Sequence, residues 1–267
     1  MNATPIPLSK RIAYPLVTLV VLLAAWSAAI AFFKVPDYLL PSPMQVLSAM
    51  NVGYVQGAYW PHFLFTMKSV LAGYVAGCSL AIACGILLAE SPTFELFVYP
   101  YIVALQSMPK IAIAPLIIVW LGFGIESKIV MVALVCFFPL FINTSIGIKQ
   151  ANPQLIDVMR AFGASKSMIF LRVKLPSAAG HIFAGLQIGV VLALIGAVVA
   201  EFVASTHGLG HIIKAAAVDM QTNVMFAALL SLAALGVAGS QLLRWLHAKV
   251  VFWDRAAATS ATTPQAE

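Results

Sequence analysis

Long apolar stretches separated by short polar segments dominate this sequence of 267 residues. Six of the stretches approach or exceed the ~20 residues that a helix needs to cross the hydrocarbon layer of a membrane. We expect membrane-spanning helices at residues 12–33, 67–89, 98–121, 128–148, 178–202 and 222–246. The pattern predicts an all-α polytopic membrane protein, with one transmembrane domain over residues 1–255 and a disordered, small and polar tail at 256–267.

The first and third stretches each carry a complicating feature. The run at 12–33 follows Lys10 and Arg11, as in a signal peptide, but it is longer than the ~7–15 apolar residues of a cleaved signal. We therefore predict a retained first span. The third stretch contains Pro109 and Pro115, and a proline inside a helix removes a hydrogen bond and bends the helix. We expect a kink there.

Residues 149–176 form a charged segment between two apolar stretches. Asn152 followed by Pro153 predicts a helix start, and Gly163 predicts a left-handed helix end. Ser165 predicts the start of a second short helix, which we expect to end before Pro176 and the fifth span.

The first of these short helices is amphipathic. Its apolar residues recur at helical spacing on one face; they are Leu155, Val158, Met159 and Phe162. Asp157 and Arg160, three residues apart, can pair on another face. A charge at the bilayer centre costs ~2.5–3.5 kcal/mol, so the helix must lie outside the hydrocarbon. Its apolar face can rest on the membrane surface or in a groove of a partner protein; the residues alone leave both open.

Composition agrees with a membrane protein, since 62% of residues are hydrophobic and 9% are charged, against ~25% charged in soluble chains. The net charge of +6 does not indicate nucleic-acid binding, because no basic stripe alternates with aromatic residues. Basic residues instead predict orientation. A cytoplasmic N-terminus leaves ten of them inside: Lys10, Arg11, Lys149, Arg160, Lys166, Arg172, Lys174, Arg244, Lys249 and Arg255. The other five are Lys34, Lys68, Lys110, Lys128 and Lys214. The segment 90–95, also expected inside, has no basic residue.

Candidate chemistry is sparse. No Gly-x-x-x-x-Gly-Lys-Ser/Thr phosphate loop is present, so we expect the chain to leave ATP binding to another polypeptide. The cysteines lie in apolar runs, and His207 and His211 lack further ligands at zinc-site spacing, so we expect no metal, cofactor or catalysis. Ionisable residues at membrane depth are functional candidates. We consider Lys110, with Met108, for a solute pathway; Glu201 is a weaker candidate that we expect to pair at the outer interface.

The charged segment resembles the EAA loop of permease subunits of bacterial ABC importers. Asp157-Val158-Met159 is followed after three residues by Gly163 and after nine more by Val173-Lys174-Leu175-Pro176. The glycine and the Leu-Pro are in register, whereas aspartate replaces the glutamate, both alanines are replaced and valine replaces isoleucine. Residues 39–46, 109–129 and 200–213 are similar to the nitrate, sulfonate, taurine and thiamine-precursor branch of binding-protein-dependent inner membrane components.

This resemblance implies a type I (MetI-like) permease fold in the bacterial inner membrane, with both termini in the cytoplasm. It implies a cytoplasmic ATPase subunit, a periplasmic substrate-binding protein and a second permease copy as partners, and a small anionic or heterocyclic solute. It assigns ATPase coupling to the loop residues Leu155, Asp157, Met159, Arg160, Phe162, Gly163, Leu175 and Pro176. The alternative functions are an ion-gradient-driven secondary transporter, for which no repeated broken helix is visible, and a membrane-embedded enzyme.

Overall fold

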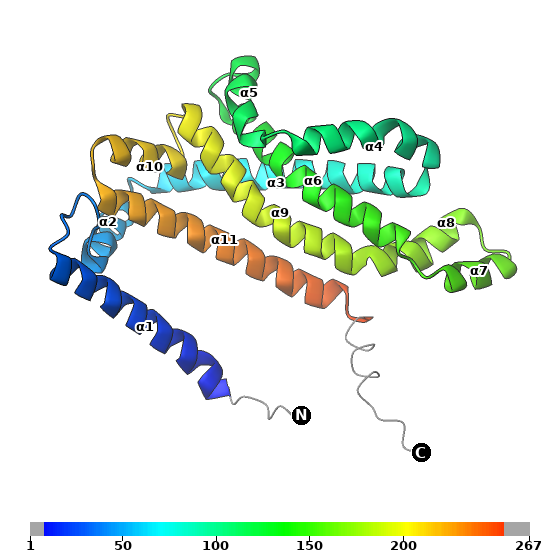
Figure 1. The fold of residues 1–267 in the computed structure, drawn as a ribbon, viewed down its shortest axis with the longest axis horizontal. Helices are drawn as coiled ribbons and strands as arrows, with labels where there is room; N and C mark the ends of the chain where they lie inside the picture. Colours follow the sequence, from blue (N-terminus) through cyan, green and yellow to red (C-terminus); the bar gives the residue numbers. More distant parts are fainter. Residues whose placement is uncertain (1–7, 254–267) are drawn as a thin grey trace.

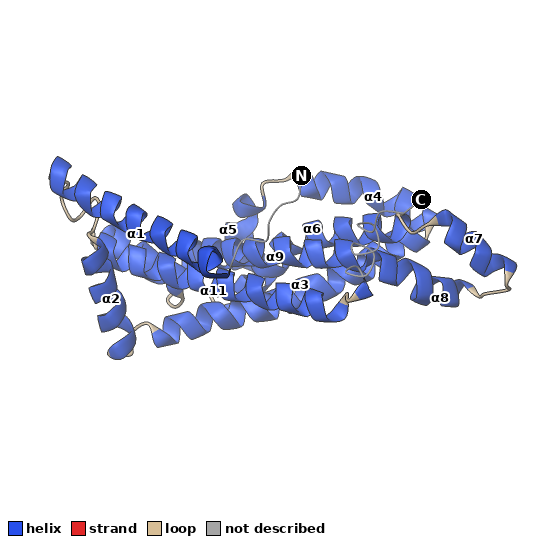
Figure 2. Cartoon of the chain, turned by 90° about the horizontal axis from the view of Figure 1, so that it is seen from below, coloured by secondary structure: helices blue, strands red, loops and turns tan. Residues whose placement is uncertain are grey.

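A computed structural model describes residues 8–253, and its described part consists of helices and connecting turns (Figures 1 and 2). The expected end of the domain at 255 and the expected tail at 256–267 lie outside these residues. The helices are α1 (Leu8–Phe33), α2 (Pro43–Val55), α3 (Trp60–Glu90), α4 (Pro92–Ser107), η1 (Lys110–Ile113), α5 (Ala114–Leu121), α6 (Ile125–Lys149), α7 (Pro153–Ala161), α8 (Lys166–Ile169), η2 (Phe170–Lys174), α9 (Leu175–Ala204), α10 (Leu209–Val218) and α11 (Thr222–Val250).

Five of the six predicted spans lie in long helices of the described chain. Helices α1, α3, α6 and α11 and the continuous run of α8, η2 and α9 are each long and apolar enough to cross a membrane. Helices α1, α3, α6 and α9 start three to seven residues before the predicted spans, because polar residues near their starts lower the local hydropathy. His62 and Lys68, for example, lower the hydropathy at the start of α3 without breaking the helix.

The prediction that residues 98–121 form one kinked helix is wrong. Helix α4 starts earlier, where Ser91 accepts a hydrogen bond from the Phe94 N–H, and it ends at Ser107. Met108 is extended (φ −72°, ψ 139°), as expected for a residue that precedes a proline. Past Pro109 the chain re-forms as η1 and α5, bent by 88° from α4. The region is therefore divided into two helical segments at Met108 and Pro109, and α5 points away from the bundle (Figure 1).

Helix α6 lies between α3 and α9, and this three-helix core depends on close approach of the backbones. Gly73 and Gly77 of α3 face α6, where an added Cβ would lie 2.6 Å from the Ile129 carbonyl oxygen and 2.7 Å from Ala133 Cα. On the other side, a Cβ on Gly185 of α9 would lie 3.0 Å from Leu140 Cα. Apolar side chains attract helices little when lipid is equally apolar, so small residues that permit close packing hold such a bundle together.

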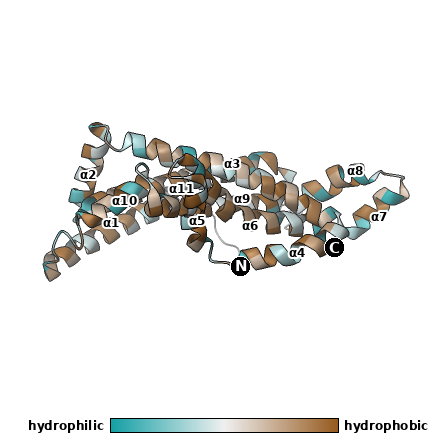
Figure 3. Cartoon of the chain, turned by 90° about the horizontal axis from the view of Figure 1, so that it is seen from above, coloured by the Kyte–Doolittle hydropathy of each residue, from teal (hydrophilic) through white to brown (hydrophobic). Residues whose placement is uncertain are grey.

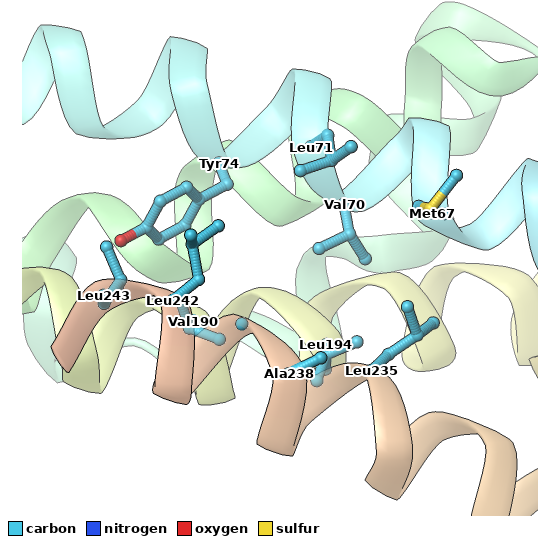
Figure 4. Close-up of a pocket in the computed structure, with 11 residues that line it drawn as sticks. Met67, Val70, Leu71, Tyr74, Val190, Leu194, Leu235, Ala238, Leu242 and Leu243 are labelled. Carbon is cyan, nitrogen blue, oxygen red and sulfur yellow. The ribbon is translucent and has the colours of Figure 1, made fainter. Parts of the chain in front are cut away.

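Helices α3, α9 and α11 enclose an apolar cavity of about 310 Å³ (Figure 4). The one hydroxyl on its wall, that of Tyr74, donates to the Leu186 carbonyl oxygen at 2.8 Å. A charged or polar solute would find no partner there. Helix α1 diverges from this part of the bundle (Figure 1) and touches α11 through Trp26, whose ring centroid lies 5.5 Å from that of Phe226.

The molecule is elongated, and polar residues are more frequent towards its two ends (Figure 3). One end carries α2 and α10, and the opposite end carries α7 and α8 (Figures 1 and 2). At the first end, Ser42 caps α2 with Pro43 in the first turn, and Gln45 completes a capping box.

The prediction that the second short helix ends before Pro176 is wrong. Helix α8 continues through the π-helical turn η2 into α9, so that Lys166–Ala204 forms one run of 39 residues. A proline normally clashes with the carbonyl four residues before it. The wider π turn lies directly before Pro176, at the place where such a clash would arise, and π turns are accommodated within longer helices.

We predict that Gly77→Val destabilises the protein by about 1–3 kcal/mol, because the added carbons meet the α6 backbone and overpack the interface. The measurement is the thermal unfolding midpoint of the detergent-purified chain. Ala76→Val, which adds bulk at the exposed neighbouring position, is the matched control and should change the free energy of unfolding by less than about 0.5 kcal/mol, so that its midpoint stays close to that of the parent. Equal midpoints for the two variants would contradict the packing argument.

Candidate functional site

The loop that joins α6 to α9 is held in shape by hydrogen bonds at each turn. Asn152 Oδ1 accepts the Gln154 N–H at 2.9 Å, which starts α7 as predicted. Gly163 is left-handed (φ +76°). Its N–H donates to the Arg160 carbonyl, and the following N–H donates to the Met159 carbonyl at 3.0 Å, the pattern of a Schellman helix end. Ser165 Oγ accepts the Met168 N–H at 3.3 Å and starts α8.

The predicted apolar face of α7 is largely presented outwards. Leu155 is 47%, Val158 52% and Phe162 86% exposed, whereas Met159 is half-buried. The ion pair between Asp157 and Arg160, at 3.3 Å, is also exposed. The loop therefore shows solvent a short row of large apolar side chains beside charges, at the end of the molecule beyond the spanning helices (Figure 1).

Leu175 and Pro176, predicted to act with this face, lie instead at the start of α9. Both are half-buried, and they follow Val173, which is 4% exposed. The structure brings Leu155 and Phe162 together on one helix face but leaves Leu175 and Pro176 at the root of the loop. Their position suits anchoring of the loop to the bundle.

Lys110 and Met108 lie at the break between α4 and α5. The Lys110 ammonium donates a hydrogen bond to the Gln106 carbonyl oxygen at 3.2 Å. It also lies 4.7 Å from the centroid of the Phe138 ring. Met108 is 49% exposed. The break thus presents a cation and a flexible apolar side chain where the helical backbone is interrupted.

A pocket of about 180 Å³ between α4 and α6 was missed from the sequence. Its walls are mainly apolar, but Tyr99, Gln106 and Ser145 line it, and Glu95 and Lys149 lie at the rim nearest the loop. The seven-residue spacing of Tyr99 and Gln106, two turns on one helix face, was the available signal. Gln106 links this pocket to Lys110 through the hydrogen bond at the break.

Glu201 is fully buried near the opposite end of the bundle. One carboxylate oxygen accepts the Thr66 hydroxyl at 2.8 Å and the other accepts the Gly210 N–H at 2.8 Å. Thr66 in turn accepts the Leu209 N–H at 2.8 Å. Glu201 therefore fixes the start of α10 to α3 and α9, and in this conformation it faces protein groups and not an open path.

Lys128 is the second fully buried charge at this end. Its ammonium donates to the carbonyl oxygens of Ala204 at 2.6 Å and Phe123 at 2.9 Å, and to Ser127 Oγ at 3.3 Å. These three bonds use all the donors of a lysine. They place a positive charge at the C-terminal end of α9, where the helix dipole favours a cation. Sequence reasoning placed Lys128 at the start of a span without assigning it partners.

His207 lies on the α9–α10 turn and His211 on α10, and each ring stacks against the ring of His62 with a centroid separation of 5.8 Å. His62 Nδ1 accepts the Gly208 N–H at 3.1 Å. Within residues 8–253, no group of three or more His, Cys, Asp or Glu side chains is arranged to hold a metal ion. The stacked rings cover the α9–α10 turn.

Residues 81–252 match the family described as binding-protein-dependent transport system inner membrane component. The riboflavin transport system permease protein of Chloroflexus aurantiacus is 35% identical over 89% of this chain and 89% of its own length. The formylaminopyrimidine transport permease protein of Halalkalibacterium halodurans is 30% identical over 90% and 96%, and the taurine transport system permease protein of Escherichia coli 29% over 92% and 92%.

Among solved structures, the chain resembles one from the inward-facing MetNI methionine ABC transporter, with a TM-score of 0.53. That likeness covers 70% of this chain and 93% of the other at 20% identity, and it shows a shared fold alone.

We predict that Glu201→Ala destabilises the protein by about 2–4 kcal/mol, because it leaves the Gly210 N–H and the Thr66 hydroxyl buried without an acceptor and removes a negative charge near Lys128. The measurement is the unfolding midpoint in detergent. Glu126→Ala, at an exposed position of the same end, should change the free energy of unfolding by less than about 0.5 kcal/mol and leave the midpoint close to that of the parent. A Glu201→Ala protein as stable as the parent would show that the buried network does not hold α10.

Proposed function

The chain belongs to the binding-protein-dependent transport inner membrane components, the permease subunits of ABC importers, and we propose that it receives its driving force at the loop between α6 and α9. Membership of this family excludes the alternative function considered from the sequence, that of an ion-gradient-driven secondary transporter. It makes the chain a multi-pass membrane permease that works in an ATP-driven importer. The proposals below concern how the parts of this chain serve that activity.

The exposed apolar face of α7 supports docking of a separate ATPase subunit. Of the two places open to this face, the membrane surface is the poorer one, because the loop lies beyond the ends of the spanning helices (Figure 1). A short helix that inserts large apolar side chains into a groove of another protein is a common recognition mode. Leu155 and Phe162 are the anchors, and the hydrogen-bonded helix ends keep α7 rigid enough to transmit movement.

ATP is bound and hydrolysed by that partner subunit, since this chain carries no phosphate loop. Two copies of the permease each offer one loop to one ATPase subunit, and a periplasmic binding protein delivers solute at the end that carries α2 and α10. Both termini lie in the cytoplasm, on the side of the basic loop, in the bacterial inner membrane. Closure of the ATPase pair shifts the packing of the spans between inward-open and outward-open states.

The solute is small and anionic or heterocyclic. The related proteins are named for taurine, aliphatic sulfonates, formylaminopyrimidine and riboflavin. In this chain Lys110 and Met108 at the broken span, together with the α4–α6 pocket, line the path. A helix break at membrane depth is tolerated where it lines a cavity or is buried in protein, and a lysine there attracts an anion.

We predict that the double variant Leu155→Asp with Phe162→Asp no longer co-purifies with the ATPase subunit, because two carboxylates cannot enter an apolar groove without losing hydration. The measurement is the amount of ATPase retained by the tagged permease in mild detergent. Val218→Asp replaces an equally exposed apolar side chain at the opposite end and should retain the ATPase. Full retention by the double variant would remove α7 as the docking element.

We predict that Lys110→Met lowers transport of an anionic solute about tenfold, the loss expected from one charge-assisted contact, while Lys110→Arg keeps most of it. The measurement is solute uptake by vesicles that hold the whole importer. Lys68→Met, which removes an exposed lysine from α3, is the control and should leave uptake unchanged. Equal uptake by Lys110→Met and the parent would place the path elsewhere.

A further inference from the structure

The turn between α3 and α4 is acidic and lies against the root of the α6–α9 loop. Glu90 is the last residue of α3, and Glu95 lies in the first turn of α4. This is the segment that lacks any basic residue although it is on the side of the basic loop. Both carboxylates are bound to lysines from elsewhere in the chain.

Each carboxylate holds one end of the loop. Lys149, the last residue of α6 before the loop, is 2.5 Å from Glu95. Lys174, the last residue of η2 after the loop, is 2.6 Å from Glu90. Among the side chains described, those of residues 13–253, these are the two ion pairs that join different elements, since the remaining one, Asp157 with Arg160, lies within α7. The short turn between α3 and α4 therefore forms one ion pair on each side of residues 150–173.

Stability alone does not account for the two pairs. Their side chains are between 23% and 39% exposed, and an ion pair at such positions shifts the unfolding equilibrium by no more than about fivefold. What the two pairs do supply is geometry. A single pair would let the turn pivot about one point, whereas two pairs fix both the position and the direction of the turn relative to the loop.

The turn leads directly into α4, which lines the pocket between α4 and α6. Ser91 caps α4 within the turn itself, so a displacement of the turn carries the start of α4 with it. Glu95 and Lys149 also form the rim of the pocket between α4 and α6. The same ion pair therefore connects the root of the loop to the lining of the pocket.

We propose that Glu90 and Glu95, through Lys174 and Lys149, are positioning residues that pass movement of the loop to α4 and so open and close the α4–α6 pocket. We call these four residues the clamp. The clamp rests on the proposed function, because it needs an ATPase that moves the loop. Within that function it assigns the step between ATPase movement and solute release to two ion pairs on one turn.

The test is charge reversal and restoration in the complete importer. Glu95→Lys and Lys149→Glu are made singly and together, as are Glu90→Lys and Lys174→Glu. The complex is reconstituted in vesicles with its ATPase and binding protein, and the solute carried per ATP hydrolysed is measured with the unfolding midpoint and the retention of the ATPase. Glu126→Lys, at the opposite end of α6, is the control.

We expect each single reversal to lower the solute carried per ATP about tenfold, within the usual range of coupling between sites, with ATPase retention and midpoint close to the parent. Each double reversal restores the pair and should return the ratio to within about threefold of the parent, as the coupling of a contacting pair requires. Glu126→Lys should change nothing. Where a reversal does not reach the membrane, the neutral Glu95→Gln and Glu90→Gln replace it.

Three results would contradict the proposal that the clamp passes movement of the loop to α4. An unchanged ratio in the single reversals would show that the pairs carry no movement. A lowered ratio that the double reversals do not restore would show that pairing is not the cause. Loss of the ATPase from the single reversals would assign the carboxylates to docking. If the parent itself retains no ATPase, the proposed function fails, and that result is distinct from all three.

Discussion

The rest of the structure depends on the close contact of α6 with α3 and α9. Lipid offers no water to drive helices together, so this core is held by backbones that approach closely at Gly73, Gly77 and Gly185. A core of that kind resists sliding and leaves the helix ends to be fixed by other forces. The polar groups of the molecule accordingly gather at its two ends.

The two ends are fixed by electrostatics of different kinds. Around Glu201 and Lys128 the charges are fully buried and every close partner is a backbone group or hydroxyl of this chain, which makes that end rigid. At the loop the charges are partly exposed and paired across helices, an arrangement that can shift without a large desolvation cost. One end of the permease is therefore rigid, and the end that carries the loop is adjustable.

The parts predictable from sequence are those set by neighbouring residues. Asn152, Gly163 and Ser165 act on the backbone within a few residues, so the helix boundaries of the loop followed directly from the sequence. The merging of α8 with α9 did not, because proline normally ends a helix and the π turn that accommodates Pro176 has no simple sequence signal. The partners of Glu201, Glu90 and Glu95 lie nine to 135 residues away, and without the packing of α3, α6 and α9 nothing along the chain identifies them.

The uninterrupted run from Lys166 to Ala204 has a consequence for how this sequence can vary. At ~1.5 Å per residue its 39 residues span about 58 Å, longer than the membrane is thick. Residue Ser165 at one end and the Glu201 network at the other therefore share one angular register. Adding or deleting a single residue between them would turn the loop by about 100° relative to the α9–α10 turn. Residues along α9 can be exchanged, but their number is constrained.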